Sequence, residues 1–479
     1  LDVDGGTIKL DGNYPVGTQN VALGDTALDS VTSGSYNTAI GHAAMTSETT
    51  GQRSVAIGRS ALQNQNLTGG QETYNVAVGF AAGNNVTTGL QNTIIGGDSG
   101  KTSTTSSNNS TLGFEALAFN TTGSYTVGIG SQALTSNTTA SNNTAVGYQA
   151  GYSNTTGDRI VAVGEGSLYS NTTGNYNVAL GSKPLRLNTT GASNVAIGHE
   201  ALYSNTTASS NTAVGFEAGY SNTVGAGNVL LGFLAGKNQT TASNNIKIGP
   251  YAGHDGNGVQ NCFIGRSSGY YSSGSYNTFV GRSVNDGAGG QMTTGAKNTI
   301  LGGFNGNQHG LDIRTSNNNI VLSDGDGNPQ LHINSAGWHT QYGPLYSYSS
   351  NASQSNITIR NNGSGADVTD YLQCRNSGNG ANLIIEPDGD VKNTNNTYGA
   401  ISDAKLKENI LGATSQWDDL KAVQVRKYNL IGSSVTQLGV VAQELEVAGM
   451  SGLVSDRADK DDDGNDLGTV TKNVKYSIL

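Results

Sequence analysis

The sequence predicts a mainly β protein whose central part is a parallel β-solenoid, and three observations lead to this fold class. Seventeen glycines recur from Gly24 to Gly302, and twelve of the sixteen intervals between them are 17 residues long. Most of these glycines end a five-residue phrase, Asn-[Val/Thr]-Ala-[Val/Ile/Leu]-Gly, as in residues 75–79. The composition is polar but weakly charged, with 69 glycines and 13% charged residues among 479. A fixed period of this length is typical of small units that become stable by stacking on their neighbours.

The five-residue phrase predicts one short strand in each repeat. Its fourth position is apolar in nearly every copy, and its second position is mostly Val or Thr. This period-two pattern between turn formers is typical of a strand. We expect the fourth-position side chain to point inward and the glycine at position 5 to allow the bend that follows.

A coil of 17 residues encloses few side chains, so an isolated column would be thin. Three copies around a shared axis would bury a second face, and the small residue at position 3, which is mostly Ala, suits a close approach between copies. The sequence therefore predicts a trimeric shaft. Lys247, Phe263 and Phe279 occupy position 3 late in the array, so we expect the packing to change there.

A column of asparagines is expected seven residues after the position-5 glycine. Equal spacing would place them directly above one another, where Asn tolerates a left-handed turn and side-chain amides can bond along the stack. Tyrosines two positions earlier predict a partial aromatic ladder, which we interpret as self-stacking, with sugar stacking as the alternative. The asparagines are Asn120, Asn137, Asn154, Asn171, Asn188, Asn205 and Asn222, and the tyrosines are Tyr152, Tyr169, Tyr203 and Tyr220.

Composition excludes several classes of function. A net charge of -10 with few Lys and Arg residues disfavours nucleic acid as a partner. No apolar run is long enough to cross a membrane, so no membrane insertion is expected. Cys262 and Cys374 are too few and too far apart for a disulfide scaffold or a metal site. Because the first residue is Leu1, we expect part of the N-terminus to be missing.

The repeats also resemble a known family. Residues 143–151, Asn-Thr-Ala-Val-Gly-Tyr-Gln-Ala-Gly, look like the head repeats of trimeric autotransporter adhesins of the YadA type. The similarity covers roughly residues 20–303, although the period of 17 differs from the shorter repeat of that family. The resemblance implies a left-handed parallel β-roll with three chains in each rod.

Changes in composition predict five segments. Residues 1–19 form a lead-in, and residues 20–303 form the repeat shaft. Residues 304–345 are a β connector with a strong turn at 324–329. Residues 346–401 form a small β module, a possible receptor-binding tip. Residues 402–479 carry 12 Asp or Glu and 9 Lys or Arg, and their apolar spacing turns helical near 438–447, which predicts a separate α+β domain.

Three sequence blocks identify a resemblance for this last domain. They are residues 402–410 (Ser-Asp-Ala-Lys-Leu-Lys-Glu-Asn-Ile), 437–446 and 474–479. In this order they closely resemble the intramolecular chaperone domain called peptidase S74, found at the C-terminus of bacteriophage tail fibres and endosialidase tailspikes. Members of that family align three chains and then cleave themselves off. Their long C-terminal helices are expected to be absent here, because the sequence ends at Leu479.

The resemblance implies an autoproteolytic site. Ser402 would be the nucleophile that attacks the carbonyl of Ile401, and Lys407 would be the general base of a Ser-Lys dyad. A serine hydroxyl needs such a base, and a lysine can serve only if burial lowers its pKa. Asp403 would position the pair. Taken alone, the same residues have a simpler interpretation, in which Ser402 or Asp403 is a helix N-cap.

Two other groups of residues are weaker candidates. Residues 459–465 begin like a calcium loop, but its twelfth position is Val470 instead of Glu, so a solvated acidic loop is favoured. Glu200 and Glu217 occupy matching positions in adjacent coils, a spacing that superficially suits a glycosidase pair. Because repeats place many residues in such columns without function, no metal or cofactor is expected and catalysis here is disfavoured.

These observations predict a structural and receptor-binding tail fibre of a bacteriophage. It would be a homotrimer in the virion tail, made in the host cytoplasm, whose only chemistry is one self-cleavage. Its expected partners are a glycan or protein receptor on the host surface and other tail proteins. The alternatives are a tailspike that depolymerises host polysaccharide and a bacterial trimeric surface adhesin.

Overall fold

The computed structural model describes residues 19–282, 286–342, 372–375, 381–385, 391–393, 417–429, 436–460 and 466–474. The chain divides into two compact units, Leu1–Tyr346 and Ser347–Leu479, and each is described by itself.

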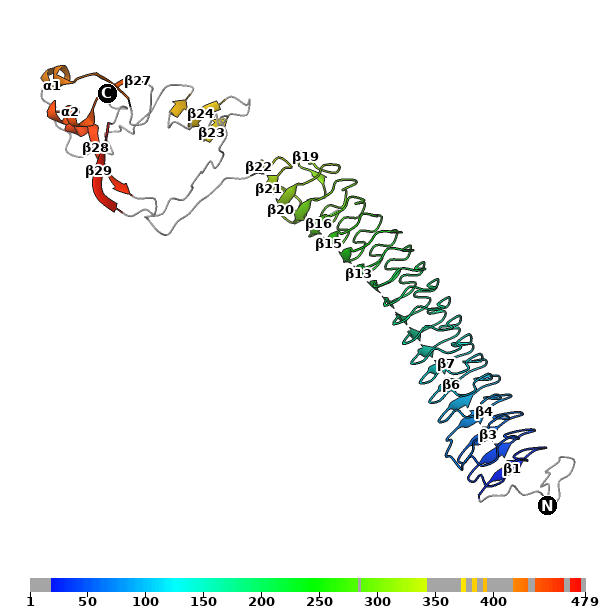
Figure 1. The fold of residues 1–479 in the computed structure, drawn as a ribbon. Helices are drawn as coiled ribbons and strands as arrows, with labels where there is room; N and C mark the ends of the chain where they lie inside the picture. Colours follow the sequence, from blue (N-terminus) through cyan, green and yellow to red (C-terminus); the bar gives the residue numbers. More distant parts are fainter. Residues whose placement is uncertain are drawn as a thin grey trace, which may run out of the picture. The chain divides into compact units, whose positions relative to one another are not determined.

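The first unit is the predicted β-solenoid. Seventeen three-residue strands pair in parallel, each with the strand of the next coil, and Figure 1 shows these coils stacked in sequence order. The usual offset is 17 residues, as between Val178 and Val195. The strands are β1 (Val21–Leu23), β2 (Thr38–Ile40), β3 (Val55–Ile57), β4 (Val76–Val78), β5 (Thr93–Ile95), β6 (Ser110–Leu112), β7 (Val127–Ile129), β8 (Thr144–Val146), β9 (Val161–Val163), β10 (Val178–Leu180), β11 (Val195–Ile197), β12 (Thr212–Val214), β13 (Val229–Leu231), β14 (Ile246–Ile248), β15 (Cys262–Ile264), β16 (Thr278–Val280) and β17 (Thr299–Leu301).

The stack ends in antiparallel strands. The strand β20 (Ile320–Ser323) continues the parallel pairing on β17. The next two strands, β21 (Pro329–Ile333) and β22 (His339–Gln341), reverse direction and pair antiparallel. A short hairpin of β18 (Asn307–Gln308) and β19 (Leu311–Asp312) lies between β17 and β20 in the chain.

The described parts of the second unit are short strands and two short helices. An antiparallel sheet contains β23 (Leu372–Arg375), β24 (Ala381–Ile385) and β25 (Val391–Asn393). The hairpins β26 (Arg426–Asn429) with β27 (Thr436–Gly439) and β28 (Val454–Lys460) with β29 (Asp466–Val474) accompany α1 (Trp417–Ala422), α2 (Ala442–Val447) and a 3-10 turn (Ser451–Leu453). None of the helices in the described residues is long and apolar enough to span a membrane.

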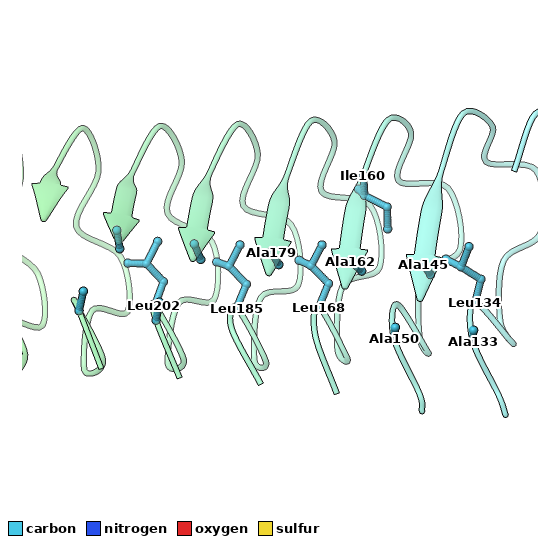
Figure 2. Close-up of a cluster of buried hydrophobic side chains, with 14 of the residues drawn as sticks. Ala133, Leu134, Ala145, Ala150, Ile160, Ala162, Leu168, Ala179, Leu185 and Leu202 are labelled. Atoms are coloured by element: carbon cyan, nitrogen blue, oxygen red, sulfur yellow. The ribbon is translucent and has the colours of Figure 1, made fainter. Parts of the chain in front are cut away.

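The side of the strand that faces the solenoid interior differs from the expectation. Position 3 points inward: Ala145, Ala162 and Ala179 are fully buried (Figure 2). The fourth-position side chain, expected to point inward, faces outward instead, as Ile197 does with 38% of its surface exposed. The expectation was wrong because position 3 is the strand side that shares the narrow interior with the rest of the coil, and in most coils that residue is Ala. Position 3 therefore cannot serve as a contact between copies.

The interior is filled by pairing small residues with large ones. Four residues after the position-5 glycine, leucines such as Leu168 and Leu185 pack beside the strand alanines (Figure 2). Where position 3 is large, this leucine is replaced by glycine. A Cβ atom on Gly269 would lie 2.6 Å from the Phe263 ring, and one on Gly253 would lie 2.6 Å from Lys247 Cδ. The predicted change of packing near Lys247 and Phe263 is confirmed, and close packing explains it.

The position-5 glycines are needed where adjacent coils approach most closely. Gly147 has φ +136°, and a Cβ atom there would lie 2.7 Å from the carbonyl carbon of Gly164 in the next coil. An L side chain is thus excluded by both backbone conformation and space.

The predicted asparagine column is confirmed. All seven side chains are fully buried, and from Asn137 onward each Nδ2 donates to Oδ1 of the asparagine one coil earlier, as from Asn171 to Asn154 at 2.8 Å. A second column at phrase position 1 works differently: Asn194 Oδ1 accepts the backbone N–H of Asn211 at 3.0 Å. The expected left-handed backbone at these asparagines was wrong. It falls instead on residues such as Leu134, with φ 52°.

We predict that Asn171→Ala destabilises the solenoid by about 2–4 kcal/mol, because it leaves buried amide groups unpaired on both sides. The lost bonds along the column join Asn171 Nδ2 to Asn154 Oδ1 and Asn188 Nδ2 to Asn171 Oδ1, at 2.8 and 2.7 Å, and the bond from Asn171 Nδ2 to Gly174 O at 3.0 Å is lost as well. Urea unfolding followed by circular dichroism measures the loss.

The matched control is Asn222→Ala at the end of the column. Asn222 donates to Asn205 at 3.2 Å, but its own buried Oδ1 accepts no hydrogen bond. The control should therefore cost about 1 kcal/mol less than Asn171→Ala. Equal losses would show that bonding along the column contributes little.

Candidate functional site

The predicted autoproteolytic residues Ile401, Ser402, Asp403 and Lys407 lie outside the described residues. Of the other two sequence blocks, residues 437–446 run from β27 through α2, and 474–479 begins at the end of β29. Ala442 and Leu445 of α2 pack with Val454 in a small buried apolar cluster. The acidic loop considered as a calcium site falls mostly on residues 461–465, which also lie outside the described residues.

One side of the described solenoid is a surface that we call the outer strand face, formed by phrase positions 2 and 4 of β1–β17. Position 4 is aliphatic in every coil, and position 2 is Val, Ile, Thr, Ser or Cys, so neither position carries a charge. Leu112 is 49% exposed and Leu301 is 42% exposed. The position-4 residues are Leu23, Ile40, Ile57, Val78, Ile95, Leu112, Ile129, Val146, Val163, Leu180, Ile197, Val214, Leu231, Ile248, Ile264, Val280 and Leu301.

This face is unusual for an isolated soluble chain. Single exposed apolar residues are common, but a continuous apolar surface along many coils marks an interaction site. Sequence reasoning missed it, because position 4 was expected to point inward. The usable signal was the frequent Ala at position 3, because a small residue suits the narrow interior of a coil.

The aromatic side chains form the predicted ladder. The rings of Tyr152 and Tyr169 stack with centroids 5.1 Å apart, and those of Tyr203 and Tyr220 stack at 5.2 Å. The Arg186 guanidinium lies 4.8 Å from the Tyr169 ring centroid. Self-stacking is thus confirmed. A sugar ring cannot lie between rings at these spacings, so sugar stacking inside either tyrosine pair is excluded.

Beside this ladder lies a mixed cluster of charged groups. The ligand atoms of His199, Glu200 and Glu217 all lie within 4.8 Å of one another. Lys237 Nζ forms an ion pair with Glu217 Oε2 at 2.7 Å. Burial, followed by the nearby Glu200 carboxylate, raises the pKa of Tyr220. The predicted pair of glutamates is therefore brought together, but with an imidazole and an ammonium group that sequence reasoning missed.

His199 escaped notice because it occupies a different repeat position from the two glutamates. It directly precedes Glu200, and Glu217 lies one coil further on. The signal that could have found it is this adjacency, since neighbouring positions on adjacent coils also lie close in space.

A lysine side chain lies inside the solenoid. Lys247 is fully buried at position 3 of β14, and its Nζ donates to Gln239 Oε1, Gly253 O and Gly256 O at 2.7, 3.1 and 3.0 Å. All three acceptors are neutral. Burial lowers the pKa of Lys247 to about 7.

Comparison of the chain with protein-family models, curated proteins and solved structures gave no match.

We predict that the free energy of unfolding rises with pH between about 7 and 10 because of Lys247. Its pKa of about 7 in the folded state lies below the ordinary value of about 10.4, so the unfolded chain binds more protons in this range. The rise can reach about 1.4 kcal/mol per pH unit. Urea unfolding at pH 7 and pH 9.5 measures it.

Lys247→Met should abolish this rise because it removes the titrating group, and it should lower stability at pH 9.5 because Gln239 Oε1 and the carbonyls of Gly253 and Gly256 lose their donor. Lys237→Met, which removes a partly exposed ammonium, is the control and should keep the rise. If Lys247→Met and the unchanged protein show the same pH dependence, Lys247 does not titrate in this range.

Proposed function

We propose that the chain is a homotrimeric fibre whose solenoid shaft holds a receptor-binding end away from a bacteriophage particle. The observation that carries the proposal is the outer strand face. A monomer would leave this apolar surface in water along its whole length, at a cost of about 25 cal/mol for each Å².

Other copies of the same chain are the occupants that fit best. The face is uncharged, so it offers no complementarity to a charged partner. The apolar residues of the face also recur once in every coil. Another copy of this chain presents apolar residues at the same spacing along its length. Rotation about an axis parallel to the shaft would bring coil against matching coil in every chain, which is the closed arrangement typical of homo-oligomers.

The role in a virion rests on the three sequence blocks that resemble peptidase S74 domains, and the rod fits that role because solenoids are extended and repetitive. In this proposal the partners are a glycan or protein receptor on the host surface and the other tail proteins. The final domain aligns three chains and then cleaves the bond before Ser402, with Lys407 as base and Asp403 as the positioning group.

A tailspike depolymerase is the second candidate, and the proximity of Glu200 to Glu217 favours it. A retaining glycosidase requires carboxyl groups about 5–5.5 Å apart. The ion pair between Glu217 and Lys237 weakens this candidate, because it ties one of the two carboxylates to a cation. Release of shorter oligosaccharides from host polysaccharide, and its loss in Glu200→Gln, would establish the depolymerase.

We predict that Val214→Asp converts the trimer to monomers, because three carboxylates would be buried at one level of the interface. Val224→Asp is the matched control, ten residues further along the chain. Val214 is 36% exposed on the outer strand face, whereas Val224 is 51% exposed outside the strands. Multi-angle light scattering gives the mass of each. If Val214→Asp stays trimeric with an unchanged circular dichroism spectrum, the interface lies elsewhere.

The intact denatured mass of the full-length protein tests the cleavage. We expect a product that ends at Ile401, and a full-length chain for Ser402→Ala, because alanine has no hydroxyl to attack the carbonyl. Ser402→Cys should cleave at a changed rate, which separates nucleophilic attack from a helix-capping role. A full-length mass for the unchanged protein would contradict autoproteolysis. It would not bear on the trimer, which the light-scattering experiment tests separately.

A further inference from the structure

The cluster of His199, Glu200 and Glu217 is assembled by the stacking of coils. His199 and Glu200 follow Gly198 in one coil, and Glu217 occupies the position of Glu200 in the next coil. Three potential ligands, one imidazole nitrogen and two carboxylate oxygens, thereby come within 4.8 Å of one another. Two carboxylates at this spacing repel each other, and Lys237 pairs with Glu217 on one side.

The backbone and the ring contacts hold these side chains in place. The Glu217 N–H donates to the His199 carbonyl at 2.9 Å, and the Glu200 N–H donates to the Ser182 carbonyl at 3.0 Å. The His199 ring stacks on Phe216 with centroids 5.1 Å apart and an angle of 8° between the planes. This stacking leaves the nitrogens at the ring edge.

We propose that His199, Glu200 and Glu217 bind a divalent transition-metal ion of the zinc class on the surface of the solenoid. Imidazole nitrogen with carboxylate oxygen is a donor set that such ions accept, whereas Ca²⁺ takes six to eight oxygen ligands. Zinc ligands lie about 2.0–2.2 Å from the metal. Small side-chain rotations that move each ligand atom by less than about 1 Å would bring all three atoms to this distance from one ion. Water completes the coordination.

The bound ion links two coils. It neutralises the repulsion between Glu200 and Glu217, and it joins residues of successive coils that are otherwise held by backbone bonds. Binding to the folded chain alone would raise its stability in proportion to the logarithm of the free metal concentration. The site depends on neither trimer formation nor cleavage at Ser402.

Calorimetric titration of the full chain with Zn²⁺ tests the proposal. We expect His199→Ala and Glu200→Gln each to weaken binding by more than about tenfold, since each removes a ligand. Lys237→Met should tighten binding about fivefold, because it removes a cation that competes for Glu217. Titration with Co²⁺ should produce a visible absorption band that His199→Ala abolishes, and Ca²⁺ should not displace Zn²⁺.

Two His–Asp pairs serve as internal controls. His42 lies 3.7 Å from Asp25, and His254 lies 2.8 Å from Asp255. Each pair offers two donors, so His42→Ala and His254→Ala should leave the strongest site unchanged. The proposal is overturned if His199→Ala/Glu200→Gln, with an unchanged circular dichroism spectrum, binds Zn²⁺ as tightly as the original chain. It is also overturned if Lys237→Met has no effect on affinity.

Discussion

The solenoid depends on hydrogen bonds that run between coils at a fixed offset along the chain. Backbone pairing joins Val178 to Val195, and the buried amides of Asn171 and Asn188 repeat the same step of 17 residues. Some polar groups are satisfied within a coil, as when Asn171 Nδ2 donates to Gly174 O at 3.0 Å, but the strand backbone and the remaining amide groups find their partners in adjacent coils. The coils of 16 residues late in the array keep the same partners, as Asn261 N–H donates to Asn245 Oδ1 at 2.9 Å, so the alignment of the columns is kept even where the coil length changes.

The narrow interior has a second consequence for the surface. With Ala179 and Leu185 filling a coil, the bulkier aliphatic residues of the strand are left on the outside. The inner face of each strand is thus mostly small and buried, whereas the outer face is aliphatic and partly exposed. The inner one closes the coil, and the outer one is available to other chains. The apolar outer strand face is thus a consequence of how little space the interior of a coil provides.

Much of the solenoid could be predicted from the sequence, because residues that are one repeat apart in the sequence become neighbours in adjacent coils. The amide bonds of the asparagine column and the stacking of Tyr152 on Tyr169 follow from spacing alone. The inward face could not be derived in the same way: a three-residue strand with apolar residues at positions 2 and 4 and a small one at 3 satisfies period two with either side inward. Steric volume decides it. His199 was missed because its column differs from that of Glu200, and the predicted residues around Ser402 depend on resemblance.

The in-register asparagine column also bears on how such a chain changes in length. If one 17-residue unit were inserted or deleted between Asn137 and Asn205, each asparagine of the column would still lie next to another asparagine. The hydrogen bonds from Nδ2 to Oδ1 along the column would therefore be kept. Each such event would change the rod by about 4.8 Å, the spacing of adjacent strands. Insertions of other sizes would have to bulge out as loops between columns. Tandem duplication therefore adjusts the reach of the protein in discrete steps, without any need to redesign its interior.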